Sequence, residues 1–469
     1  MGEPRGFLEI ERCEQPERPP RERTADHADI HGRLPTEELR RQGARCMDCG
    51  IPFCLDDCPL GNLIPDWNDL VHRDRWRQAI DQLHATNPFP ELTGLICPAP
   101  CESACVLEIN DDPVTIKQIE LAIAERAWDE GWIVPRPPPR RTGRRVAVIG
   151  SGPAGMAVAA QLNQAGHEVT MYERDEAPGG LNRFGVPDQK LPKDVIDRRI
   201  ALMEAEGVVV HCGIDVGVDV DPQELWDSTD ALVIATGARA ERELDVPGSD
   251  LRGVHPAMEY LYARNRAVAA GRTEQCPPPS AADRTVVVIG AGDTSADCMS
   301  NAIREGARSV VQLDTYPAPT GTRPREIAGW PRSPRRSPTH YALDEGGRRV
   351  SAVEVTALLG RDGHVCAVEG TEIEPPPSRR PIAGTQFSHD ADLVLVAIGF
   401  AGPEPELLDA LDIERNEQGR VRATRHATTT PGVFVAGDAQ VGPSLTVTAL
   451  NEGLRCARTV DHWLGSRTG

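Results

Sequence analysis

The sequence has no long hydrophobic segment. Its 469 residues contain no apolar run of about 18, the length that a membrane-spanning helix needs. Residues 1–23 are charged throughout and do not resemble a secretory signal peptide. We therefore expect a soluble, cytoplasmic protein that does not contact a membrane.

An excess of positive charge is also missing. The chain has 51 Lys and Arg residues against 71 Asp and Glu residues, which gives a net charge of −20. Because nucleic acids are bound mainly through basic side chains, we do not expect nucleic-acid binding. The length predicts two to four domains, since a domain has roughly 150 residues.

Paired cysteines are absent from Gly180 onward. The cysteines there are isolated, and none lies in a CxxC or CxxxxC pair. This excludes a reactive dithiol, the group that a disulfide reductase uses, from that part of the chain. The isolated cysteines are Cys212, Cys276, Cys298, Cys366 and Cys456.

Seven of the 13 cysteines are instead crowded into residues 46–105. In a cytosolic chain such short gaps indicate metal binding or catalysis. The first four resemble the ferredoxin run that ends in Cys-Pro, with a middle gap of four residues instead of two. Thiolates suit zinc as well as iron-sulfur clusters, and the Cys-Pro endings favour iron-sulfur. The candidate ligands are Cys46, Cys49, Cys54, Cys58, Cys97, Cys101 and Cys105.

Seven cysteines are one fewer than two 4Fe-4S clusters need at four ligands each. Either one cluster has a non-cysteine ligand, or only one cluster is present, or Cys13 folds back. Apolar residues recur at helical spacing in residues 67–85 and 115–128. We expect residues 1–140 to form a mostly α-helical domain, stabilised by its metal centres as much as by its core. A linker rich in Pro and Arg, residues 134–145, marks its end.

Residues 145–174 have the pattern of a dinucleotide-binding βαβ unit. A β-branched strand at 146–149 leads into Gly150, Gly152 and Gly155 in GxGxxG spacing. A helix is predicted from about residue 153 to 165, then a strand at 169–172 that ends at Glu173, an acid placed to bind an adenosine ribose. The alternative is an ordinary glycine-rich turn, which the order of strand, glycines, helix, strand and acid disfavours.

A second unit begins with the strand at residues 285–289. Gly290 and Gly292 follow, and Ser295 replaces the third glycine. A helix from about 295 to 305 and a strand at 309–313 complete the unit and predict a second dinucleotide. Asp314 favours the 2′-hydroxyl of NAD, whereas Arg304 and Arg308 suit the 2′-phosphate of NADP, so the local residues leave this choice open.

Three further strands are predicted at residues 230–237, 392–399 and 432–438, and the second of them returns the chain to the sheet. We therefore expect an α/β fold in which a Rossmann-like NAD(P) domain (281–400) is inserted into a Rossmann-like FAD domain (141–280 and 401–469). Residues 317–338 are predicted to be an irregular surface excursion. The candidate cofactor-binding residues are Gly150, Gly152, Ala154, Gly155, Glu173, Arg174, Gly180, Leu181, Thr236, Gly237, Gly290, Gly292, Asp293, Thr294, Arg304, Arg308, Gly437, Asp438, Ser444, Leu445 and Thr446.

These cofactors differ in how they carry electrons. A nicotinamide delivers two together, an iron-sulfur cluster accepts one, and a flavin does both. The chain therefore has the parts of a two-to-one electron converter whose outlet is the amino-terminal cysteine region.

Several segments resemble the small (beta) subunit of bacterial NADPH-dependent glutamate synthase: RCMDCGIPFC, CPLGNLIPDWNDLV, CPAPCESAC, INDDPVTIKQIE, GSGPAG, GGLNRFGVPDQKL, GAGDTSADC and AGDAQVGPSL. The likeness spans residues 46 to about 457. It implies electron transfer from NADPH through FAD and two 4Fe-4S clusters to the FMN of a large (alpha) subunit, in a hetero-oligomer. That subunit converts L-glutamine and 2-oxoglutarate into L-glutamate.

Likeness to the related region of dihydropyrimidine dehydrogenase implies the cluster ligands. Cys46, Cys49, Cys54 and Cys105 would hold one cluster, and Cys58, Cys97, Cys101 and Glu120 the other. The alternative for Glu120 is a solvated helix acid. The chain departs from the family at Ser295, at GDAQVGPSLTV and around residues 320–338.

Two other functions are compatible with these motifs. One is a free-standing NAD(P)H:acceptor oxidoreductase of the same architecture, serving a ferredoxin-type partner. The other is a zinc-bearing interaction module on a degenerate nucleotide-binding scaffold, which would be colourless when purified.

Overall fold

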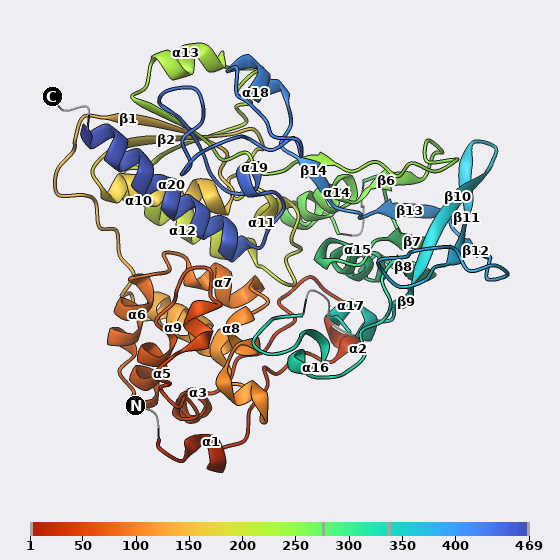
Figure 1. The fold of residues 1–469 in the computed structure, drawn as a ribbon, viewed down its shortest axis with the longest axis horizontal. Helices are drawn as coiled ribbons and strands as arrows, with labels where there is room; N and C mark the ends of the chain where they lie inside the picture. Colours follow the sequence, from red (N-terminus) through yellow and green to blue (C-terminus); the bar gives the residue numbers. More distant parts are fainter. Residues whose placement is uncertain (1–2, 274–276, 335–338, 467–469) are drawn as a thin grey trace.

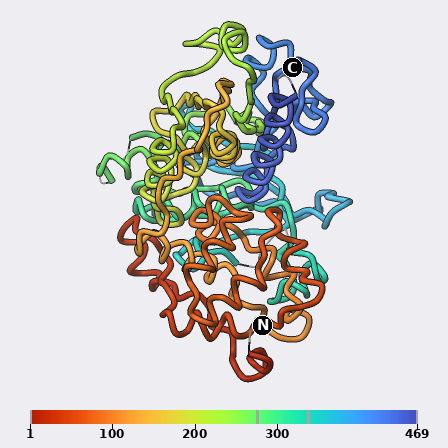
Figure 2. Tube along the Cα trace, turned by 90° about the vertical axis from the view of Figure 1, so that its left-hand side faces the viewer, coloured from red at the N-terminus to blue at the C-terminus, as the bar shows by residue number. Residues whose placement is uncertain are grey.

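The computed structural model describes residues 3–273, 277–334 and 339–466 of the chain. A helical domain precedes two α/β domains, which lie above it and to its right in Figure 1. The view in Figure 2 again places the helical domain at one end of the molecule. The predicted fold class is thus confirmed.

The helical domain is built from short helices, as the apolar spacing predicts. Trp67 and Val71 of α5 and Ile119 and Ile123 of α9 are buried, whereas Leu70 lies at the edge of this core. The elements are α1 (Gly6–Glu9), α2 (Pro20–Arg23), α3 (Thr36–Ala44), α4 (Phe53–Asp56), α5 (Ile64–His72), α6 (Trp76–His84), α7 (Pro90–Ile96), α8 (Pro100–Ser103), η1 (Val106–Ile109) and α9 (Ile116–Asp129).

The first α/β domain contains a five-stranded parallel sheet of order β15-β4-β1-β2-β3. Because β4 and residues 146–149 of β1 are apolar and inside the sheet, they are buried on both faces. The elements are β1 (Arg145–Ile149), α10 (Pro153–Gln164), β2 (Glu168–Glu173), α11 (Leu181–Phe184), α12 (Lys193–Ala205), β3 (Val209–Cys212), α13 (Pro222–Asp227), β4 (Ala231–Ile234), α18 (Glu406–Ala410), β15 (Val433–Val435), α19 (Asp438–Val441) and α20 (Thr446–Ser466).

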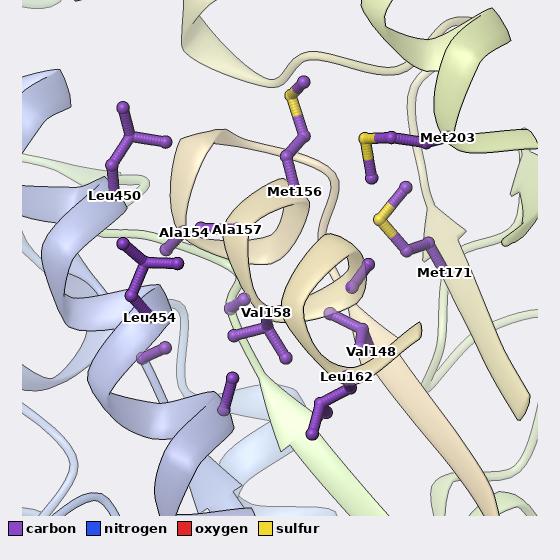
Figure 3. Close-up of a cluster of buried hydrophobic side chains, with 14 of the residues drawn as sticks. Val148, Ala154, Met156, Ala157, Val158, Leu162, Met171, Met203, Leu450 and Leu454 are labelled. Carbon is purple, nitrogen blue, oxygen red and sulfur yellow. The ribbon is translucent and has the colours of Figure 1, made fainter. Parts of the chain in front are cut away.

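The long helix α20 covers α10 on one face of this sheet. Figure 3 shows Leu450 and Leu454 of α20 directed toward α10. This packing binds the last part of the chain to the first βαβ unit, so the first domain is closed by residues far along the sequence.

The second α/β domain has its own five-stranded parallel sheet, of order β6-β13-β7-β8-β9. An antiparallel group β10-β11-β12 extends from it, and β14 pairs with β5 between the two domains. The elements are β5 (Ala240–Glu241), β6 (Val254–Pro256), α14 (Ala257–Ala269), β7 (Thr285–Ile289), α15 (Asp293–Arg304), β8 (Ser309–Asp314), α16 (Pro324–Ala328), α17 (Tyr341–Asp344), β9 (Arg348–Ser351), β10 (Val353–Arg361), β11 (His364–Glu372), β12 (Phe387–Asp390), β13 (Leu393–Val396) and β14 (Phe400–Gly402).

The structure moves the predicted start of the second domain. Strand β6 pairs with β13, and α14 packs into the core of the second sheet, although both precede residue 281. The predicted boundary was too late because β6 has only three residues and carries no motif. The insertion itself is as expected, since β15 pairs with β4 of the first sheet.

Residues 317–334, predicted to be an irregular surface excursion, are irregular apart from one short helix and contact the helical domain. They contain α16, which contacts η1 of the helical domain, and Figure 1 shows this segment beside the helical domain. The remaining residues of the predicted excursion, 335–338, lie outside the described ranges.

The cysteines in the described ranges are all free thiols, and Cys276 lies outside those ranges. Among the described helices, none combines the length and the apolar character needed to cross a membrane.

Candidate functional site

A cavity of about 470 Å³ opens at the carboxyl ends of the first sheet. Its size is in the range of ligand pockets, and its position is where α/β folds bind nucleotides. Among the predicted residues, Gly150, Gly152, Ala154, Glu173, Arg174, Gly180, Leu181, Thr236, Gly237, Asp438, Ser444 and Thr446 line this first-domain cavity.

Glycine is required at two positions around the start of α10, for a different structural reason at each. Gly150 has a φ of 103°, and a Cβ there would collide with the carbonyl of Ala235 on the neighbouring chain segment. A Cβ on Gly155 would collide with the carbonyl of Gly150, so this glycine permits the turn although it does not line the cavity. The backbone amides at the start of α10 are consequently accessible to a pyrophosphate.

Two acids face the same cavity. Glu173, 4% exposed at the end of β2, accepts a hydrogen bond from the Ser151 amide at 3.1 Å. Asp438 begins α19 and accepts a hydrogen bond from the Ser444 hydroxyl at 2.6 Å. Burial raises the pKa of Asp438. These groups have the position and chemistry to bind ribose and sugar-chain hydroxyls.

The cavity also includes residues that carry no recognisable motif. They come from α11, the loop after β3, the segment after β4 and the residues at and just before the start of α18, which come together only through the tertiary fold. Conversely, Gly437 and Leu445 do not line it, and the Leu445 side chain is 39% exposed. The lining residues that the sequence analysis missed include Asn182, Asp215, Gly217, Arg239, Glu404 and Glu406.

The second βαβ unit repeats the backbone geometry of the first. Gly290 has a φ of 132°, and a Cβ there would collide with the carbonyl of Ala397. Helix α15 begins at Asp293, directly after Gly292 and with Thr294 in its first turn. Ser295 is fully buried, and its hydroxyl donates to the Gly292 carbonyl at 2.7 Å. A serine therefore fits where the first unit has glycine.

Arg304, a candidate for binding the 2′-phosphate of NADP, has its guanidinium engaged elsewhere. It ends α15, roughly 16 Å along the helix from the glycine turn. Its guanidinium is 1% exposed and pairs with Glu345 at 2.7 Å, and it donates at 3.0 Å to the carbonyls of Arg23 and Asp26. Arg304 thus fastens the amino-terminal arm to the second domain.

Arg308 is also misplaced for this role. It precedes β8, so it lies at the amino-terminal edge of a parallel sheet whose nucleotide site is at the opposite edge. Its Nε donates to the Asp283 carbonyl at 2.7 Å, and its side chain is 66% exposed. Both arginines lie between the end of α15 and the start of β8, away from the glycine turn at which α15 begins.

The cysteines divide between two cavities in the helical domain. Cys46, Cys49, Cys54 and Cys105 line the first, which we call the Cys46 cavity. Burial raises the pKa of Cys54 to about 12 and that of Cys46 to about 11. The thiols therefore keep their protons at neutral pH until a metal replaces them.

Glu120 belongs to the second group. The Cys58 cavity is lined by Cys58, Cys97, Cys101 and Glu120. Burial raises the pKa of Glu120 to about 7, and its Oε1 accepts hydrogen bonds from Thr93 and from Asn87, the latter at 2.9 Å. A solvated helix acid is excluded, because Glu120 is 6% exposed.

Four thiolates suit either a zinc ion or an iron-sulfur cluster. In the described ranges, no group of three or more His, Cys, Asp or Glu side chains is arranged to hold one metal ion. Cys13 lines neither cavity, so it does not fold back to supply a ligand.

The three cavities adjoin one another. Thr446 lines the first-domain cavity, and the next residue, Val447, lines the Cys58 cavity. Ile64 lines both the Cys58 and the Cys46 cavities. The order is therefore first-domain cavity, Cys58 cavity, Cys46 cavity.

Two known families match the chain. The pyridine nucleotide-disulphide oxidoreductase family covers residues 144–453. The family described as dihydropyrimidine dehydrogenase domain II, 4Fe-4S cluster, covers residues 23–132. Together they correspond to the α/β domains and the helical domain.

Relatives and solved structures extend this likeness. The Mycobacterium tuberculosis glutamate synthase [NADPH] small chain is 48% identical over 99% of this chain and 96% of its own. The Schizosaccharomyces pombe glutamate synthase [NADH] is 42% identical over 97% of this chain but only 22% of its own length. The M. tuberculosis FprA structure in complex with NADPH, at 20% identity, covers 69% of this chain and 85% of its own, with a TM-score of 0.54, which shows a shared fold. On this sequence likeness, the chain belongs to the family of glutamate synthase small chains.

Proposed function

We propose that this chain is the electron-input subunit of a glutamate synthase, carrying electrons from NADPH through FAD and two 4Fe-4S clusters to the FMN of a large subunit that makes L-glutamate from L-glutamine and 2-oxoglutarate. The observation that carries the proposal is the series of adjoining cavities, which runs from a dinucleotide cavity through two cysteine cavities.

The first α/β domain holds FAD in this proposal. The amides that follow Gly150 bind the pyrophosphate, Glu173 binds the adenosine ribose, and Asp438 binds a hydroxyl of the flavin chain. The start of α20 at Thr446 faces the same cavity. When bound, the flavin supplies the exchange between two-electron nicotinamide chemistry and one-electron cluster chemistry.

The second α/β domain, which we place at about residues 254–399, binds NADPH at the glycine turn. Gly290, Gly292, Asp293 and Thr294 form the start of α15, where backbone amides suit a pyrophosphate. A relative named for NADPH is 48% identical to the chain, and this supports the choice of donor.

The helical domain holds one cluster in each cysteine cavity. Four thiols are available in the Cys46 cavity, and three thiols with the Glu120 carboxylate in the Cys58 cavity. Because the Cys58 cavity adjoins the first domain, its cluster is the inner one. The outer cluster faces the surface near Cys49, where the Ile51 side chain is 67% exposed.

The partner is the large subunit. In S. pombe, the segment that resembles this chain is about a fifth of a longer glutamate synthase. This supports the association of the chain with a larger protein that binds near Cys49 and Ile51.

Anaerobic titration with NADPH, and separately with NADH, tests the proposal. We expect NADPH to bleach the visible bands of flavin and clusters, and iron analysis to give about eight atoms per chain, four for each cluster. Copurification with a large FMN protein is expected. A colourless protein would contradict the proposal, and a coloured protein that reduces ferredoxin without binding a large partner would favour the free-standing reductase.

Replacement of a ligand tests the order of the sites. Cys58→Ser is expected to leave flavin reduction by NADPH intact and to stop transfer to the large subunit, because the inner cluster is lost. The matched control is Cys366→Ser, which changes a half-buried thiol on β11 of the second domain. For Glu120, a Glu120→Ala protein that kept both clusters with unchanged potentials would remove this residue from the ligand set.

A further inference from the structure

Residues 323–332 of the second domain lie against the helical domain. This segment, which we call the cap, includes α16 and follows β8 of the second sheet. Helix α16 contacts η1, the short helix directly after Cys105, and Figure 1 shows it at the border of the two domains. The cap therefore connects the second domain to residues that line the Cys46 cavity.

Trp330 contacts the wall of this cavity. Its indole Nε1 donates to the Cys105 carbonyl at 3.1 Å, and its ring centroid lies 4.8 Å from that of Phe53, at an interplanar angle of 56°. Phe53 and Cys105 both line the Cys46 cavity. A half-buried tryptophan thus packs on two residues of the cavity wall.

Two arginines anchor the cap on the chain that follows Cys105. Arg325 donates to the Ile109 carbonyl at 2.6 Å. Arg323 donates to the Asp111 carbonyl and, at 3.2 Å, to a carboxylate oxygen of Asp112. Its Nε also lies 3.7 Å from Glu108, which is 1% exposed. These contacts fasten the cap to the helical domain on the amino-terminal side of Trp330.

We propose that the cap shields the outer cluster, with Trp330 covering the Phe53 and Cys105 side of the Cys46 cavity against water and small solutes. The proposal rests on the proposed function, because it requires a cluster in that cavity. It leaves the Cys49 and Ile51 side as the open one, the side at which we place the large subunit. Shielding by the second domain also explains why an irregular segment crosses to the helical domain.

The rate of iron release under anaerobic conditions tests whether the cap shields the outer cluster. Protein carrying both clusters is mixed with an iron(II) chelator, and chelate absorbance is followed while EPR of the reduced protein reports which cluster remains. In Trp330→Ala we expect half of the iron to be released about tenfold faster than in the wild type, since both the aromatic contact with Phe53 and the hydrogen bond to Cys105 are lost. The other half should keep its wild-type rate.

Three further variants complete the experiment. Trp330→Phe keeps the ring and should stay within about threefold of the wild type, because only the hydrogen bond is lost. Arg325→Ala removes an anchor and should accelerate the same half of the iron by less than Trp330→Ala, which keeps the test valid if the alanine variant at 330 does not fold. Trp132→Ala is the control, since Trp132 is a half-buried tryptophan of the helical domain that lines neither cysteine cavity.

The outcomes separate the cap from the proposed function. A wild-type protein without two clusters would overturn the proposed function itself. If the wild type carries two clusters but Trp330→Ala releases iron no faster than the wild type or Trp132→Ala, the shielding role of the cap is overturned and the proposed function stands. Equal acceleration of both halves of the iron would also overturn it, because it would indicate general loosening of the domain.

Discussion

The two βαβ units of this chain share a backbone design and differ in what surrounds it. In both, a glycine with positive φ ends the first strand, because a neighbouring carbonyl leaves no space for a side chain. At the third motif position the first unit requires glycine, whereas the second accepts a serine that is hydrogen-bonded. At the far end of the helix, only the second unit carries a buried ion cluster with the amino-terminal arm. The motif thus specifies the turn, and the surrounding structure decides what else each helix does.

Breaking the ion cluster at the end of α15 should cause the largest loss of stability. The Glu345 side chain is fully buried and pairs with Arg23 at 2.8 Å and with Arg304 at 2.7 Å. Glu345→Ala leaves the buried Arg304 guanidinium without its carboxylate and leaves Arg23 with Glu17 alone, so we expect a loss of about 3–5 kcal/mol in the free energy of unfolding. Urea unfolding measures it. Glu414→Ala, which breaks the exposed pair with Arg422, is the control and should cost less than about 1 kcal/mol.

A substitution of the third glycine of the first unit should have the second largest effect on stability. Gly155→Ala places a Cβ against the Gly150 carbonyl, so the turn must shift, at a cost of about 1–3 kcal/mol. Because this turn faces the first-domain cavity, the purified variant should contain less flavin per chain. A variant with full flavin content and unchanged stability would show that the turn adjusts without cost.

A substitution at the corresponding position of the second unit should destabilise the protein less. Ser295→Ala removes a hydroxyl that also accepts a hydrogen bond from Gln312 at 2.7 Å. We expect a loss of about 1–2 kcal/mol in unfolding free energy, because two buried hydrogen bonds disappear, and no loss of flavin. Reduced flavin content in this variant would mean that the two units are not independent.

The smallest effect is expected at Arg308. Arg308→Ala should leave the affinity for NADPH within about twofold of the wild type, since the side chain lies at the edge of the sheet opposite the nucleotide site. Titration of the flavin absorbance with NADPH measures this. A tenfold loss of affinity would restore Arg308 as a 2′-phosphate ligand.

Much of the fold could be predicted because it depends on short-range patterns. Strand β7 has the bounds expected from its β-branched run, and α10 ends within one residue of the prediction. The start of the second domain could not be predicted, since β6 is short and its place depends on pairing with β13. Arg304 was misassigned for a similar reason, because its partner Glu345 is 41 residues away.

The sequence by itself determined the two glycine turns, the two short-gap runs of cysteines and the alternation of strand and helix, since each depends on residues close together along the chain. Only the tertiary structure decided which residues share a cavity, that Glu120 joins three thiols, and that Trp330 reaches Cys105 across 225 residues. The physical reason is that spacing constrains only nearby backbone, whereas contacts between distant segments depend on how whole domains pack.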